Sequence, residues 1–481
     1  RDVPETGRGV HRRRLPISVA NMNTSVASVN RTDHADAVAD LVERYRAVPP
    51  GQRVRLGKPS SNLFRFGGSR PDVQLLDTSR LTGVIDVDPV ARTADVQGMT
   101  TYEDLVDATL AHGLMPLVVP QLKTITLGGA VAGLGIESTS FRHGLPHESV
   151  LEMDLLTGSG EVVTARPDGE HADLYATFPN SYGTLGYTLR LRIELQPVAP
   201  FARLTHHRFG SAAEAAAEIE RVCDLHGAGA DVDFVDGTVF DGGEQYVTVG
   251  RFVDEPMPGA QVSDYTGRQI FYRSLQQRPV DHLTTRDYLW RWDTDWFWCS
   301  RAFGVQNPLV RRVWPRRYRR SDVYRRLVAL DQRHGVTNRL ADLTRSPRQE
   351  MVIQDVEIPV ENLDRFLEVF HRDVGISPVW LCPIRLRGKR EWPLYPMEAG
   401  RLYVNVGFWS TVDQVPGRPD AHNRLIEELV AELGGHKSLY STGHHDQAEV
   451  WRRYNGDAYR AVKDRYDPDG RLPGLYSKVV G

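Results

Sequence analysis

The feature that most constrains the fold of this 481-residue chain is a glycine-rich segment, TLGGAVAGLGIES, at residues 126–138. Four glycines, Gly128, Gly129, Gly133 and Gly135, lie within eight residues. Glycines allow a backbone to pass close to a ligand and to direct successive N–H groups at a phosphate. The segment is not the GxGxxG fingerprint, and its context is not that of a Rossmann unit. By itself it predicts either a phosphate-binding loop or the start of a small-residue helix packed against a sheet.

Two further segments have a similar character. GKPSSN at 57–62 ends a short predicted strand and offers backbone N–H groups, hydroxyls and a lysine. GTLGY at 183–187 precedes an alternating apolar strand that runs to residue 197. Taken alone, the first is better explained as a surface turn, and the second is equally well explained as a tight turn into a strand.

Hydrophobic periodicity along the rest of the chain predicts an α+β protein without internal repeats. Helical spacing of apolar residues occurs at 34–46, 100–114, 211–226, 321–334, 361–373 and 420–433. Strand patterns occur at 231–239, 244–253, 351–358 and 401–408, with a hairpin at 150–165. A chain of this length exceeds what one hydrophobic core usually supports, so we expect more than one domain.

In this order and spacing, the three glycine-containing segments resemble the FAD-binding domain of the vanillyl-alcohol oxidase type. The stretches TLGGAVAGLGIESTSFRHGL (126–145), ADLYATFPNSYGTLGY (172–187) and PVWLCPIRL (378–386) are similar to the sterol side-chain (delta-24) reductase family, called Seladin or Diminuto. EMDLLTGSGEVV, NPLVRRVWP and EVWRRYNGDAYRAVKDRY also look like that family. The resemblance covers residues 50–200 well and the C-terminal half in patches.

The resemblance implies a two-part fold. An FAD-binding domain at 34–200 is expected to precede an α+β substrate (cap) domain at 201–440, and Pro197 and Pro200 mark the boundary. Residues 1–33 are expected to be irregular, and 441–481 to return to the FAD-binding domain. Expected FAD-binding residues are Gly57, Lys58, Pro59, Ser60, Ser61, Asn62, Thr126, Leu127, Gly128, Gly129, Gly133, Gly135, Ile136, Glu137, Ser138, Gly144, Gly183, Thr184, Gly186 and Tyr187.

Relatives of this kind use NADPH to reduce FAD, which then reduces an isolated double bond in an apolar lipid. Wider relatives often attach FAD covalently through a His or Cys in the first loop, but 57–62 contains neither, so we expect a non-covalent flavin. An unactivated alkene must be protonated before it can accept hydride. Glu137, His143 and Tyr182 are the candidate proton donors. Cys382 is a poor acid for an alkene and is better explained by packing.

Composition narrows the classes of function. The 59 basic and 62 acidic residues give a net charge of −3, which argues against a nucleic-acid partner. The three cysteines, far apart in the sequence, suggest neither a disulfide framework nor a metal site. No apolar run approaches the roughly 18–20 residues of a membrane span, and the N-terminus lacks the features of a secretory signal. We therefore expect a cytoplasmic protein, although the chain lacks an initial Met and could be processed or incomplete.

Residues 286–326 form a distinctive segment with five of the nine tryptophans and eleven arginines against four aspartates. Tryptophan with arginine is typical of an interface with anionic lipid, so the segment predicts peripheral contact with the inner face of the cell membrane, at the entrance of the substrate pocket. The alternative is a solvated basic helix beside an aromatic domain interface.

The substrate itself has no sequence motif. The Ala-, Arg- and Asp-rich composition is typical of a high-GC actinobacterium, where sterols are rarely made and branched fatty acids are common. This context favours a methylene-branched fatty acyl chain, reduced to a methyl-branched one, over a sterol. Two other functions stay open: an FAD-dependent oxidase that passes electrons to oxygen, and a binding protein that retains the fold without flavin.

Overall fold

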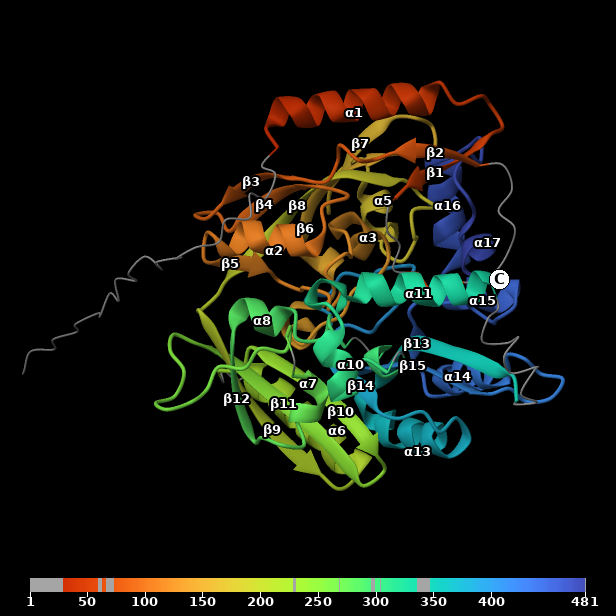
Figure 1. The fold of residues 1–481 in the computed structure, drawn as a ribbon. Helices are drawn as coiled ribbons and strands as arrows, with labels where there is room; N and C mark the ends of the chain where they lie inside the picture. Colours follow the sequence, from red (N-terminus) through yellow and green to blue (C-terminus); the bar gives the residue numbers. More distant parts are fainter. Residues whose placement is uncertain are drawn as a thin grey trace, which may run out of the picture.

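The computed structural model describes residues 29–58, 63–65, 73–227, 231–267, 269–295, 299–302, 304–334 and 347–480. Two large sheets dominate it, one above the other in the view of Figure 1. No described helix is both long and apolar enough to cross a membrane.

The first sheet has the order β3-β4-β8-β6-β7, with β5 also paired to β8. Its strands are β3 (Val84–Asp88), β4 (Thr93–Gln97), β5 (Leu114–Pro116), β6 (Val150–Leu156), β7 (Val162–Ala165) and β8 (Tyr187–Pro197). A separate parallel pair consists of β1 (Arg53–Gly57) and β2 (Val73–Asp77). β8 is central because its apolar alternation fills the core on one face, while β4 and β6 pair with its two edges.

Helices from both ends of the chain surround this sheet. They are α1 (Arg31–Arg46), α2 (Tyr102–Leu110), α3 (Leu127–Ala132), α4 (Ser140–His143), η1 (Pro146–Ser149), α5 (Ala172–Thr177), α16 (Gly456–Tyr466) and α17 (Leu475–Val479). The C-terminal α16 packs against α5, and the backbone N–H of Val54 in β1 donates to the carbonyl of Arg471 at 3.0 Å.

The second sheet has eight strands in the order β12-β9-β11-β10-β14-β15-β13-β16, all antiparallel. Its strands are β9 (Phe201–Phe209), β10 (Phe234–Asp241), β11 (Glu244–Val253), β12 (Val280–Thr284), β13 (Gln349–Pro359), β14 (Val379–Ile384), β15 (Tyr403–Asp413) and β16 (His436–Lys437). The remaining helices are α6 (Ala212–Gly227), α7 (Phe271–Ser274), α8 (Thr285–Leu289), α9 (Cys299–Ala302), α10 (Pro308–Val313), η3 (Arg316–Tyr318), α11 (Ser321–His334), η4 (Val360–Asn362), α13 (Leu363–Asp373), α14 (Ala421–Glu432) and α15 (Gln447–Arg453).

The two faces of the second sheet belong to different cores. Val379 and Leu381 of β14 pack with α6, α13 and α14, which cover one face. Trp380 and Cys382 alternate with them and pack instead into the core that contains Leu127 of α3. Side chains at alternate positions of β13, β14 and β15 are therefore directed toward the glycine-rich segment and the other elements around the first sheet, which are called the first half of the molecule below; the second sheet and its helices are the second half.

The predicted α+β class and the expected helices and strands are confirmed, with small shifts at their ends. α1 begins at Arg31 because Asn30 caps it, accepting the N–H of Asp33 at 2.8 Å. The helix predicted to end at residue 114 ends at Leu110, because Gly113 takes a positive φ of 69° and the chain then enters β5. The predicted domain boundaries stay a prediction.

The prediction that the tryptophans of 286–326 face a membrane is wrong for Trp290 and Trp292, which are buried in the protein core at 0% and 3% exposure. Arg291, Arg311 and Arg319 are also buried, and each donates hydrogen bonds to protein acceptors. Trp296 and Trp298 lie outside the described residues. A tryptophan covered by protein on all sides has no surface left for a lipid interface, so the aromatic-cluster alternative holds for this part of the segment.

Candidate functional site

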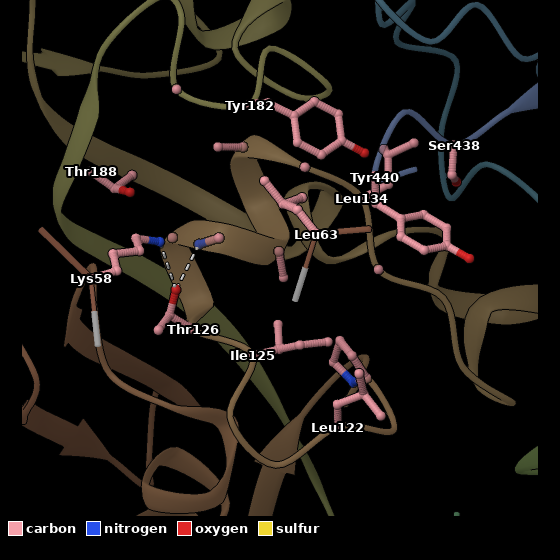
Figure 2. A pocket seen from close by; sticks show the side chains of 18 of the residues that line it. Lys58, Leu63, Leu122, Ile125, Thr126, Leu134, Tyr182, Thr188, Ser438 and Tyr440 are labelled. Atoms are coloured by element: carbon pink, nitrogen blue, oxygen red, sulfur yellow. Dashed lines mark hydrogen bonds between the residues drawn. The ribbon is translucent and has the colours of Figure 1, made fainter. Parts of the chain in front are cut away.

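A cavity of about 430 Å³ lies between the glycine-rich segment and the second sheet. Its lining includes residues of β1, of the stretch 120–136 and of the turn at 182–188. It also includes Leu63, Phe64, Arg65, Met99 and Phe178, and five residues from later in the chain: Asp355, Trp380, Ser438, Tyr440 and Lys478. Figure 2 shows Lys58 and Thr126 at one end of this cavity and Ser438 and Tyr440 at the other. Chain segments more than 200 residues apart thus build one site.

The glycine-rich segment forms the short helix α3 and its approach. Thr126 caps the helix by accepting the N–H of Gly129 at 3.1 Å. A Cβ at Gly128 would lie 2.1 Å from Thr188 Oγ1, so this glycine allows α3 to pack closely on β8. A Cβ at Gly129 would be directed at Thr126 Oγ1 and toward Lys58 Nζ, on the cavity wall. Gly128 therefore serves the packing of α3, and ligand contact stays a prediction for Gly129.

Lys58 supplies a cation at the start of α3. Its Nζ donates to Thr126 Oγ1 at 3.4 Å (Figure 2). The side chain is accessible from the cavity that it lines. The protein around it disfavours the charged form and lowers the pKa of its ammonium group to about 8. A cation in such surroundings is stabilised by an anionic ligand. Together with the bare backbone at Gly129, it fits a phosphate-containing group such as the pyrophosphate of FAD.

The turn before β8 is held against α3 by backbone hydrogen bonds. The N–H of Asn180 donates to Gly133 at 3.1 Å, and the N–H of Tyr182 donates to Ala132 at 2.7 Å. Both residues have positive φ, 63° and 53°, which side chains other than glycine adopt at a cost. The turn places the Tyr182 ring on the cavity wall, with the Arg65 guanidinium stacked on it 4.4 Å from the ring centre.

The structure brings many of the residues predicted to bind FAD or to donate a proton to the cavity and leaves others away from it. Those that line it are Lys58, Thr126, Gly128, Gly129, Gly133, Gly135, Ile136, Tyr182, Gly183, Gly186 and Tyr187. Gly57, Leu127, Glu137, Ser138, His143, Gly144 and Thr184 do not line it. Pro59, Ser60, Ser61 and Asn62 lie outside the described residues.

Glu137 is part of a buried charge cluster next to the cavity rather than within it. Arg291 donates to Glu137 at 2.8 Å and to Asp236 at 2.6 Å, and all three side chains are at most 4% exposed. Burial raises the pKa of Glu137, and the Arg291 charge opposes that rise. The cluster joins the glycine-rich segment to β10 and the end of α8, so its first consequence is to hold the two halves together.

His143 and Cys382 also lack the position of a proton donor. The Nε2 of His143 lies 3.1 Å from Gln196 Oε1, and burial, with the neighbouring Arg142 charge, lowers the pKa of His143 to about 3. The imidazole is therefore neutral at physiological pH. Cys382 is fully buried, and burial raises the pKa of its thiol, as expected of a packing residue.

Sequence reasoning missed the polar residues that the second sheet contributes. Asp355 lines the cavity, and burial raises its pKa to about 6. Glu357 lies two residues along β13, where burial raises the pKa of its carboxyl group well above the ordinary value and the charge of Asp355 adds to the rise. The alternation Asp355-Val-Glu357-Ile in β13 was the available signal, but it is typical of a strand with one solvated face.

Comparison with known proteins agrees with this geometry. Residues 17–166 match a family model described as an FAD binding domain. The chain is 25% identical over 439 residues to Delta(24)-sterol reductase of Arabidopsis thaliana, which covers 84% of this chain and 76% of that protein. It is 24% identical over 414 residues to Delta(24)-sterol reductase of Homo sapiens, covering 83% and 76%. A shorter match, 33% identical over 184 residues, is to cytokinin dehydrogenase 2 of Oryza sativa subsp. japonica, covering 36% and 32%. The predicted resemblance, the fold class and the flavin cofactor are thereby confirmed.

Proposed function

We propose that this FAD-dependent oxidoreductase, similar to Delta(24)-sterol reductases over most of its length, reduces an isolated carbon–carbon double bond in an apolar lipid. The observation that carries the proposal is the character of the cavity lining away from Lys58. It is largely aliphatic and aromatic, and Asp355 is the one acid among the described lining residues. Such a lining excludes water from a hydrocarbon and leaves an acid within reach of it.

The chemistry of an unactivated alkene explains why this combination matters. The double bond has no carbonyl group to hold negative charge, so a proton must be added first, at the less substituted carbon. Bound FAD, once reduced, would supply the hydride for the second carbon. The protein must exclude water, because water would capture the electron-deficient carbon, and it must keep one carboxyl group protonated in an apolar setting.

The substrate that we favour is a methylene-branched fatty acyl chain, within a phospholipid, which becomes methyl-branched on reduction. Protonation of its CH₂ group leaves a tertiary centre, as it does in the side chain of a delta-24 sterol. The sterol is the alternative, and the names of the relatives favour it. The acyl chain rests on the composition of the sequence.

NADPH is the electron source in this proposal, and FAD is held without a covalent bond. Among the described residues that line the cavity there is neither His nor Cys, the side chains through which wider relatives attach flavin. The test is anaerobic. NADPH should bleach the bound flavin, and a phospholipid with a methylene-branched chain should restore its colour faster than a delta-24 sterol.

The outcomes of this test separate the alternatives. If the sterol restores the flavin colour faster, the substrate is the sterol and not the acyl chain. Recovery only with oxygen, with release of hydrogen peroxide, would identify an oxidase. A purified protein without flavin would refute an enzyme of this class altogether.

A substrate dissolved in a bilayer requires contact with a membrane surface, and we place that contact on α10 and η3, at the cytoplasmic face of the membrane. Leu309 and Val313 of α10 are 75% and 78% exposed, and Tyr318 is 43% exposed. Arg312 and Arg317, also exposed, lie beside them. Apolar side chains flanked by arginines suit an anionic bilayer. None of the described residues of 286–326 lines the cavity. Our proposal therefore keeps a membrane contact in this segment but no longer places the entrance of the pocket there.

A further inference from the structure

One face of β13 carries two carboxyl groups toward the cavity side of the second sheet. Asp355 and Glu357 are two residues apart, so they share a face of the strand and their Cα atoms lie about 7 Å apart. The opposite face packs on α14, where Gln354 donates to Asn423 Oδ1 at 2.8 Å. Asp355 lines the cavity, and Glu357, which does not, is 0% exposed.

The immediate partners of these carboxyl groups are polar and buried. Asn405 lies opposite Glu357 in the pairing of β13 with β15, and its Nδ2 donates to Asp355 Oδ1 at 3.3 Å. Ser438 Oγ donates to Glu357 Oε1 at 3.2 Å, and the Tyr395 hydroxyl also donates to Glu357. Asn405 is fully buried, yet its Oδ1 has no hydrogen-bond partner among the described residues. Asn405 does not line the cavity, so it acts on the cavity through Asp355, whose Oδ1 it contacts.

We propose that Asp355 is the proton donor to the alkene, positioned by Asn405 on the cavity wall. This assignment rests on the proposed function. The Asp355 carboxyl group gives its proton to the CH₂ carbon, whose new C–H bond takes the electron pair of the double bond. The branched carbon is left electron-deficient and accepts the hydride that the reduced cofactor supplies. Asp355 becomes a carboxylate and regains a proton from water when the product leaves.

Among the other ionisable groups at the cavity, Lys58 has a pKa lowered to about 8, so its ammonium group is a weaker acid than the Asp355 carboxyl group. Burial raises the pKa of the Tyr182 and Tyr440 hydroxyls, so they are weaker acids than a carboxyl group. Arg65 is stacked on Tyr182 and donates to the carbonyl oxygens of Leu439 and Lys478. Burial raises the pKa of Asp355 to about 6, and an apolar lipid in the cavity would raise it further by removing water.

The test compares four variants of the holoenzyme in the two half-reactions. Asp355→Asn removes the acid at nearly constant size, and Asp355→Glu restores it. Glu357→Gln removes the second carboxyl group of the same face. Glu350→Gln is the matched control, because Glu350 is a buried carboxylate of β13 that faces α14 and accepts the N–H of Asn423 at 2.9 Å.

We expect Asp355→Asn to keep its FAD and its rate of flavin reduction by NADPH, and to lose about 100-fold or more in flavin reoxidation by the lipid. Asp355→Glu should recover part of that loss, and Glu350→Gln should resemble the parent. A readout without NADPH or lipid is the visible spectrum of bound oxidised flavin against pH. The parent should show a transition near pH 6 that Asp355→Asn lacks.

The possible results are distinguishable. If no alkene lipid reoxidises the parent, the proposed function fails. If the lipid reoxidises the parent and Asp355→Asn equally fast, the function stands and the assignment of Asp355 is overturned. A loss confined to Glu357→Gln would also overturn it, in favour of Glu357. A transition near pH 6 that persists in Asp355→Asn would show that another group titrates there.

Discussion

The strongest test of the interface between the two halves is Arg291→Met, which removes the cation of the buried charge cluster. Arg291 is 1% exposed and contacts Glu137 at 2.8 Å and Asp236 at 2.6 Å. At an effective dielectric constant of about 20, one such contact is worth about 6 kcal/mol of attraction before desolvation. Desolvation of three charged groups offsets most of this, but removal of the cation leaves carboxylates buried without a counter-charge. Breaking a buried pair in this way typically costs about 3–5 kcal/mol of the free energy of unfolding.

The assay is urea unfolding of the holoenzyme, with Arg316→Met as the matched control. Arg316 belongs to the same segment and pairs with Asp264 at the same 2.8 Å, but the two side chains are 64% and 47% exposed. An exposed pair contributes about 0–1 kcal/mol, so Arg316→Met should unfold almost like the parent. If Arg291→Met also unfolds within about 1 kcal/mol of the parent, the cluster does not hold the two halves together.

The pH dependence of Arg291→Met gives an independent check. Burial already raises the folded-state pKa of Glu137, and Arg291 is the main group that opposes this rise. Without Arg291 the folded state binds a proton at Glu137 more tightly than the unfolded state does. The stability deficit of Arg291→Met should therefore be largest at neutral pH and shrink as the pH falls toward the unfolded pKa. A second change, Glu137→Gln, should restore part of the lost stability at neutral pH. A deficit that grows on acidification would refute this account.

Three further predictions concern the cofactor and the membrane. Gly129→Val should lose most of its flavin, because the new side chain would be directed toward Lys58 on the cavity wall. Full FAD occupancy in this variant, measured by the ratio of flavin to protein absorbance, would contradict the ligand role. Gly128→Ala should instead reduce the free energy of unfolding by about 1–3 kcal/mol through overpacking on β8. Acid or heat denaturation should release free FAD into the supernatant, and flavin that remains with the precipitate would disprove the non-covalent binding. The double change Leu309→Asp and Val313→Asp should weaken sedimentation with anionic vesicles while FAD content is unchanged, and unaltered sedimentation would exclude α10 as the contact surface.

The sequence by itself was sufficient for the fold class, the cofactor and one wall of the site. The glycine-rich segment at 126–138 and the turn at 183–187 are local patterns, because the need for a bare backbone or a positive φ is fixed by the residue itself. The strands and helices also follow from periodicities within a few turns or a few strand residues. The short strand β1 and the lysine that follows it were found in the same way.

The tertiary structure decided which polar groups face the cavity and which charges are buried. Asp355 and Glu357 alternate with valine and isoleucine in the pattern of a half-solvated strand, and only the packing of the first half over that face turns it into an interior. The sequence predicts Glu137 as an acid of the flavin loop, but in the fold it pairs with Arg291, 154 residues away. The tryptophans beside Arg291 face the core for the same reason. Burial depends on elements distant in the sequence, so neither the pKa of a carboxyl group nor the solvent exposure of a tryptophan could be predicted from its neighbours in the chain.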